Sequence, residues 1–103
     1  MSIYKGIVVV LLGAMLFSSH VSAAKDPCQD ISKLATGIMK YRQQGMSLAD
    51  FVEVTDKQED NSLKSAAKKL IFEAYRVPQY DSEKFRQKAV REFADKAYLD
   101  CAT

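Results

Sequence analysis

The sequence predicts an all-α protein: a compact bundle of about four helices closed by one disulfide between its two ends. Apolar residues recur at intervals of three and four in several segments, which is the period of a helix. Helix-capping residues separate these segments, and no segment alternates apolar and polar residues as a half-buried strand does. The 103-residue chain has two cysteines, which lie near the two ends of the domain expected after signal cleavage, at Cys28 and Cys101.

The first 24 residues are predicted to be a cleaved secretory signal peptide. A short start carrying Lys5 precedes the apolar run 6–17, GIVVVLLGAMLF, and small residues follow at 21–24. This order is typical of signal peptides. A helix of that run spans about 18 Å, against a hydrocarbon core of about 30 Å, so cleavage is favoured over a retained membrane anchor. We therefore expect residues 25–103 to form one soluble helical domain in the periplasm, with no stable membrane insertion after cleavage.

The first helix of that domain is predicted to begin at Asp26 and Pro27, because aspartate caps helices and proline suits the first helical position. Gly45 is expected to end it as a left-handed cap. Ser47 then opens a short second helix through the capping-box pattern S-L-A-D. The apolar residues expected to face the core are Ile31, Leu34, Ile38 and Tyr41 in the first helix, and Leu48, Phe51, Val52 and Val54 in the second.

The polar stretch 56–62, DKQEDNS, is predicted to be the main loop. The third helix follows it and ends at Val77 and Pro78, since the residue before a proline avoids helical geometry. Asp81 or Ser82 is expected to cap the fourth helix, with Tyr80 and Phe85 packed as a hydrophobic staple. The expected apolar stripes are Leu63, Ala66, Ala67, Leu70, Ile71, Ala74 and Tyr75 in the third helix, and Phe85, Ala89, Val90, Phe93, Ala94, Ala97 and Cys101 in the fourth.

The two cysteines predict a disulfide between Cys28 and Cys101. Export places both in an oxidising space, and two cysteines allow only one intramolecular pairing. Closing so long a loop stabilises a fold by roughly 4 kcal/mol in the chain-entropy model. The bond would join the start of the first helix to the end of the fourth, so these helices should run antiparallel and clasp the third. A redox pair is disfavoured, because the C-x-x-C spacing of that class is missing.

Composition and motifs argue against catalysis. The single histidine, His20, lies in the predicted signal, so the mature protein has no imidazole for a catalytic relay or a metal. No G-x-S-x-G, S-x-x-K or glycine-rich phosphate motif occurs. Signal cleavage removes Lys5 and lowers the net charge from +2 to +1, which gives no electrostatic basis for nucleic-acid binding. We expect a monomer that is not an enzyme, uses no cofactor or metal, and binds an unidentified protein partner.

One face of the third helix is a candidate partner-binding patch. On a helical wheel, Phe72 lies nearly opposite the middle of the apolar stripe, with basic residues beside it. An exposed aromatic among cations is typical of a binding anchor. The competing hypothesis, which the sequence favours, is that the second helix or the 77–81 loop covers Phe72. The candidate patch consists of Lys68, Lys69, Phe72, Arg76 and Tyr80.

The whole layout resembles small exported single-disulfide proteins of proteobacteria and their phages. The resemblance rests on the signal, Cys28, the helix ending in YRQQG at 41–45, the segment IFEAYRVPQY at 71–80, and a last helix ending in Cys101. The plan is also similar to that of the Hde-type periplasmic acid-stress chaperones. These resemblances imply two alternatives to simple protein binding: an acid-stress chaperone, or a phage accessory factor at the envelope in superinfection exclusion or lysis control. They assign no functional residue.

Overall fold

The computed structural model describes residues 26–103, and the predicted signal peptide lies outside the described residues. Within them the chain forms four α-helices and no strand, which confirms the all-α prediction. The helices are α2 (Pro27–Gln43), α3 (Leu48–Asp56), α4 (Asn61–Ala74) and α5 (Glu83–Ala102).

Each of these helices begins at a side chain that accepts a hydrogen bond from a backbone N–H of the first turn. Of the two residues expected to cap the last helix, Ser82 is the one that does so. α4 begins at Asn61, inside the stretch predicted to be a loop, because the Asp60 carboxylate accepts from the Leu63 N–H at 3.1 Å. The four caps are Asp26, Ser47, Asp60 and Ser82.

The end of α2 confirms the predicted glycine cap. Gly45 has a φ of +95°, which favours glycine because other side chains rarely adopt it. Its N–H donates to the Arg42 carbonyl at 3.1 Å, and the Met46 N–H donates to the Tyr41 carbonyl at 3.1 Å. This pair of bonds is a Schellman motif, and it turns the chain sharply from α2 towards α3.

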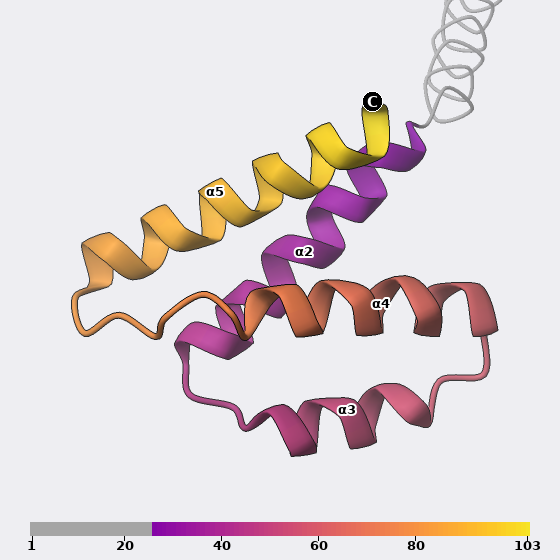
Figure 1. Ribbon diagram of the computed structural model, residues 1–103, viewed down its shortest axis with the longest axis horizontal. Coiled ribbons are helices and arrows are strands. Elements are labelled where there is room, and N and C mark those ends of the chain that lie inside the picture. The colour runs from indigo at the N-terminus through magenta and orange to yellow at the C-terminus, as the bar shows by residue number, and fades with distance from the viewer. Residues whose placement is uncertain (1–25) are drawn as a thin grey trace, which may run out of the picture.

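α2 is the central element of the bundle. It packs along α5 and against α4, and α3 packs against α4 (Figure 1). The predicted disulfide is present: Cys28 in the first turn of α2 bonds Cys101 in the last turn of α5, with their Cα atoms 5.6 Å apart. α2 and α5 therefore run antiparallel, meeting at the disulfide and diverging away from it (Figure 1).

The core lies where α2, α4 and α5 meet. Met39 and Ile71 are completely buried there, and Phe93 of α5 is 6 % exposed. α3 adds no fully buried residue to this cluster and only packs Phe51 and Val52 against it. The buried core residues are Ala35, Ile38, Met39, Leu70, Ile71, Ala74, Ala89, Phe93 and Ala97.

The ends of the predicted apolar stripes differ from expectation. Tyr41, Leu63 and Phe85 were expected in the core but are 53 %, 45 % and 51 % exposed. Two residues of α3, Leu48 and Val54, are also exposed. The reason is that each stripe runs past the point where a neighbouring helix covers it; α3 in particular has only nine residues.

A disulfide that joins the two ends of the described chain should dominate its stability. We expect the Cys28→Ser, Cys101→Ser double variant to lose roughly 4 kcal/mol of unfolding free energy, because its unfolded state regains the entropy of a 73-residue loop. Thermal melts of the variant, with reduced and alkylated wild type as the control, measure this loss. Equal melting temperatures before and after reduction would contradict it.

A second tie lies beside the disulfide, where the Tyr98 hydroxyl donates to the Asp26 carboxylate at 2.6 Å. That bond, with the one from the Cys28 N–H, lowers the pKa of Asp26 below its ordinary value of 3.8. Since the folded pKa is depressed, its stabilisation is complete above pH 3.8 and is lost as the pH falls through the folded value.

We therefore expect Asp26→Asn, which retains a capping oxygen but no charge, to melt below wild type at neutral pH. The difference should shrink below about pH 3.8 and vanish once the wild-type carboxyl is protonated. Melting curves from pH 7 to about pH 2 test this, with Asp95→Asn on the exposed face of α5 as the control. A difference that is independent of pH would show that the Asp26 charge contributes nothing.

Candidate partner-binding surfaces

An apolar groove lies where α2, α3 and α4 come together. It encloses about 340 Å³, and apolar side chains from all three helices supply most of its walls. Three of them, Tyr41, Val54 and Leu63, are each about half exposed. We call this the α2–α3–α4 groove, and define it by Leu34, Gly37, Tyr41, Val54, Leu63 and Ala67.

The aromatic end of the groove is built by edge-to-face ring contacts. The Tyr41 ring meets Phe51 of α3 with centroids 5.7 Å apart, and Phe51 meets Tyr75 at 6.4 Å. The Tyr75 hydroxyl donates to the Met46 carbonyl, and the Arg42 guanidinium lies 4.8 Å over the Tyr75 ring. Burial raises the pKa of Tyr75, against the opposing effect of the Arg42 charge. The contact with Phe51 supports one edge of the exposed Tyr41 ring, and the Tyr75 contacts in turn support Phe51.

Gly37 forms part of the groove floor. It lies in the interior of α2, where glycine costs about 0.5–1 kcal/mol relative to alanine. A Cβ built on it would have no neighbour within 4 Å beyond the adjoining backbone of its own helix. The protein's own packing therefore does not require a glycine at this position.

The predicted patch on α4 is only partly assembled. Phe72 is 48 % exposed, so the expectation that the second helix or the 77–81 loop covers it is wrong. α3 packs against α4, with Lys68 in an ion pair with Asp56 at 2.7 Å, but neither α3 nor the loop covers the Phe72 ring. Lys69 and Arg76 are exposed as predicted. Tyr80 packs its ring against Phe85, with centroids 6.1 Å apart, as the predicted staple at the start of α5.

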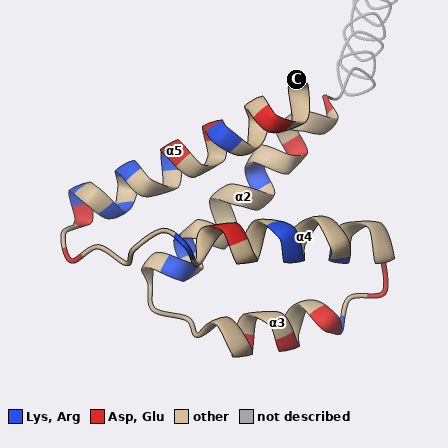
Figure 2. Ribbon diagram, in the orientation of Figure 1, with Lys and Arg blue, Asp and Glu red and all other residues tan. Residues whose placement is uncertain are grey.

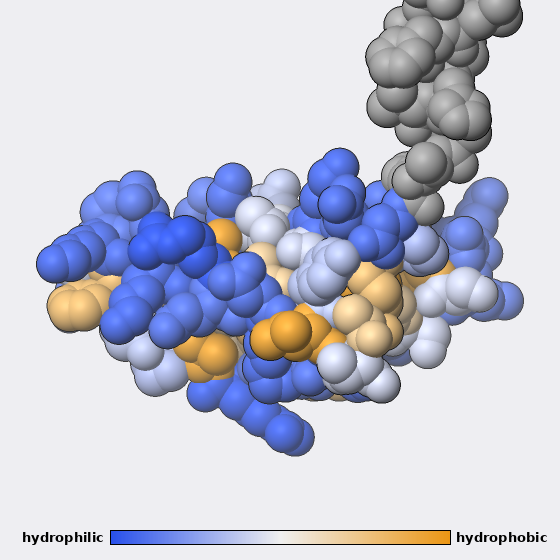
Figure 3. All heavy atoms as spheres, turned by 90° about the horizontal axis from the view of Figure 1, so that it is seen from above, coloured by the Kyte–Doolittle hydropathy of each residue, from blue (hydrophilic) through white to orange (hydrophobic). Residues whose placement is uncertain are grey.

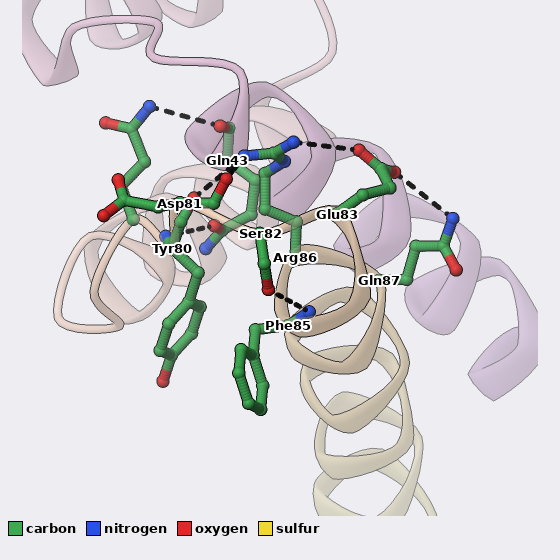
Figure 4. A network of polar contacts seen from close by, with 9 residues as sticks. Gln43, Tyr80, Asp81, Ser82, Glu83, Phe85, Arg86 and Gln87 are labelled. Atoms are coloured by element: carbon green, nitrogen blue, oxygen red, sulfur yellow. Dashed lines mark hydrogen bonds and ion pairs between the residues drawn. The ribbon is translucent and has the colours of Figure 1, made fainter.

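A polar cleft of about 600 Å³ separates the diverging halves of α2 and α5. Arg86 lines this cleft. Its guanidinium donates to the Tyr80 carbonyl at 3.1 Å, to the Asp81 carbonyl at 2.7 Å and to the Glu83 carboxylate at 3.0 Å (Figure 4). Hydrogen bonds from Arg86 and then Gln87 lower the pKa of Glu83. These groups are engaged with one another and with the loop backbone, which is a structural role.

Beside this cleft, hydrogen bonds of Gln43 join the end of α2 to the loop 77–80, and we call this set of bonds the Gln43 latch. Gln43 is 4 % exposed, and its side chain donates to the Pro78 carbonyl at 2.9 Å. It also accepts from the Tyr80 N–H at 2.9 Å (Figure 4). The Gln79 amide returns a bond to the Gln43 carbonyl at 3.2 Å, and Arg42 donates to Val77 at 3.1 Å. These hydrogen bonds join the end of α2, within the YRQQG segment, to the VPQY loop. Both segments belong to the residues on which the resemblance to small exported single-disulfide proteins rests.

The remaining surface is charged and mixed in sign. Figure 2 shows Lys and Arg interspersed with Asp and Glu along α5, whereas the charges within α3 are all acidic. Seen from the α5 side, hydrophilic residues cover most of the surface, and apolar residues gather in a patch near its middle (Figure 3). Among residues 26–103, no three His, Cys, Asp or Glu side chains cluster as metal ligands. No helix in this range is long and apolar enough to cross a membrane.

Comparisons with known proteins return no match: no protein-family model, no curated protein and no solved structure aligns with this chain. The resemblance to small exported single-disulfide proteins therefore stays a prediction.

The sequence did not predict the α2–α3–α4 groove. Its residues other than Gly37 lie on the predicted apolar stripes, and helical spacing fixes the direction of a side chain but not the reach of the neighbouring helix. One signal was present: Gly37 interrupts an otherwise well-formed helix between two apolar stripe positions, Leu34 and Ile38.

The exposure of Phe72 sets the expected cost of removing it. We expect Phe72→Ala to lower the free energy of unfolding by less than about 1 kcal/mol, because half of the ring is already in water and alanine favours the helix. The matched Phe93→Ala variant removes a buried ring and should cost about 3–5 kcal/mol. Urea denaturation of both variants measures the difference, and equal losses would place Phe72 in the core.

Proposed function

We propose that this is an exported periplasmic domain that acts by binding another protein, without catalysing a reaction, and that the α2–α3–α4 groove holds the partner. One observation carries the proposal: Tyr41, Val54 and Leu63 come from three different helices, are 53 %, 51 % and 45 % exposed, and line the same hollow. Single exposed apolar side chains are ordinary, whereas convergent ones mark interaction surfaces.

The groove has the composition of a binding site. Its walls are largely apolar with few polar groups, and its volume falls at the low end of the range for ligand pockets. Tyr41 is of the residue type that dominates interface energies, and its contact with Phe51 orders it beforehand. Binding would then take apolar area out of water at little cost in side-chain entropy.

The contrast with the polar cleft supports this choice. Arg86, Glu83 and Gln43 already hold partners within the chain, so a ligand that bound these three side chains would have to break existing hydrogen bonds. In the groove, a ligand displaces only water from apolar surface. The outer face of α4 around Phe72 is a weaker candidate, because its Lys68 is engaged with Asp56.

Site-specific photocrosslinking in the periplasm of a Gram-negative host tests the proposal. We expect a benzophenone amino acid at Val54 to give a discrete adduct of higher mass, because this side chain would lie against the bound partner. The matched control is the same amino acid at Leu99 of α5, which is 60 % exposed and does not line the groove. No adduct from Val54, or the same adducts from both positions, would contradict the proposal.

A further inference from the structure

Building on this proposed function, we infer that the occupant of the α2–α3–α4 groove is an amphipathic helix of the partner protein, which lies along α2 over Gly37 and places an acidic residue opposite Lys33.

The first argument is the space above Gly37. The glycine weakens α2, yet a Cβ there would meet nothing from the rest of the chain. The empty space belongs to the groove. A missing side chain at such a point lets another backbone approach closely, which is a use of glycine that the isolated domain does not exploit.

The second argument concerns backbone hydrogen bonds. Helices form most of the groove walls, so their N–H and C=O groups are paired internally, and the Thr55 hydroxyl donates to the Phe51 carbonyl at 2.8 Å. No strand within residues 26–103 offers a free edge to an incoming peptide. An extended peptide buried here would leave its own backbone groups unpaired, whereas a helix satisfies them itself.

The third argument is length. The residues of α2 that line the groove run from Lys33 to Tyr41, which is about 12 Å along the helix axis. Two turns of a bound helix cover nearly the same distance, at about 11 Å. Apolar anchors at i, i+4 and i+7 of the partner would therefore span the groove from end to end.

The fourth argument is charge. Lys33 is the one ionised side chain among the groove-lining residues, and it is exposed at the end away from Tyr41. A carboxylate on the partner helix at that end would be attracted and a cation repelled. An exposed pair of this kind changes affinity by about two- to five-fold.

Synthetic peptides of about 14 residues, stapled as helices with leucine at i, i+4 and i+7, provide the probe. Three versions carry Glu, Gln or Lys at the end that faces Lys33. Fluorescence anisotropy measures their Kd for the full disulfide-bonded mature chain and for its variants.

We expect the Glu peptide to bind wild type about two- to five-fold more tightly than the Lys peptide, and Lys33→Glu to reverse that order. Gly37→Leu should weaken binding of all three at least about tenfold, because it fills the groove floor. Gly37→Ala should also weaken binding while raising the melting temperature by about 2–8 °C. Ser65→Leu, which places the same leucine side chain at an exposed position of α4, is the control and should bind as wild type.

Several results would overturn the inference. One is that Gly37→Leu leaves the peptide affinity unchanged. Another is that the Lys33→Glu variant still binds the Glu peptide more tightly than the Lys peptide. Sedimentation equilibrium showing a dimer that Gly37→Leu dissociates would assign the groove to a second copy of this chain. Tight binding of laurate without peptide binding would assign it to a small amphiphile. A Val54 adduct whose mass differs from that of a dimer of this chain would still support binding of another protein, whereas loss of that adduct counts against the proposed function itself.

Discussion

The position of α2 is fixed at both of its ends, and the other elements are arranged around it. At the start, the Cys28–Cys101 bond and the Asp26–Tyr98 hydrogen bond join it to the end of α5. At its C-terminal end, the buried Gln43 side chain forms hydrogen bonds with the backbone of the loop that leads into α5. α2 and α5 are thereby held antiparallel but diverging, and α4 supplies the apolar side chains that complete the core between them.

This arrangement explains why one face of α2 stays open. Its Ala35 and Met39 are buried against the core, while Leu34, Gly37 and Tyr41 turn towards α3. α3 is short, follows a tight glycine turn and packs against α4, so it forms one wall of the groove without closing it. The exposed apolar side chains are thus a consequence of how the helices are connected, and they give the domain a surface that another protein can cover.

Local signals predicted much of this fold. Short-range chemistry determines the caps at Asp26, Ser47 and Ser82 and the turn at Gly45, and the presence of two cysteines near the ends of the domain predicted the disulfide. The uncovered residues were not predictable in the same way. Helical spacing places Tyr41 and Leu63 on apolar stripes, but whether a neighbour covers them depends on packing between helices distant in sequence. The Gln43 latch spans 35 to 37 residues, and no local pattern indicates that a polar side chain there is buried.

The most direct test of the groove as the binding surface is a methyl NMR titration of the disulfide-bonded chain with the acidic helical peptide. The account predicts chemical-shift changes concentrated at the methyl groups of Leu34, Val54 and Leu63, with little change at the buried Ile71. Changes confined to methyl and aromatic signals around Phe72 on the outer face of α4, with the groove methyls unmoved, would contradict it.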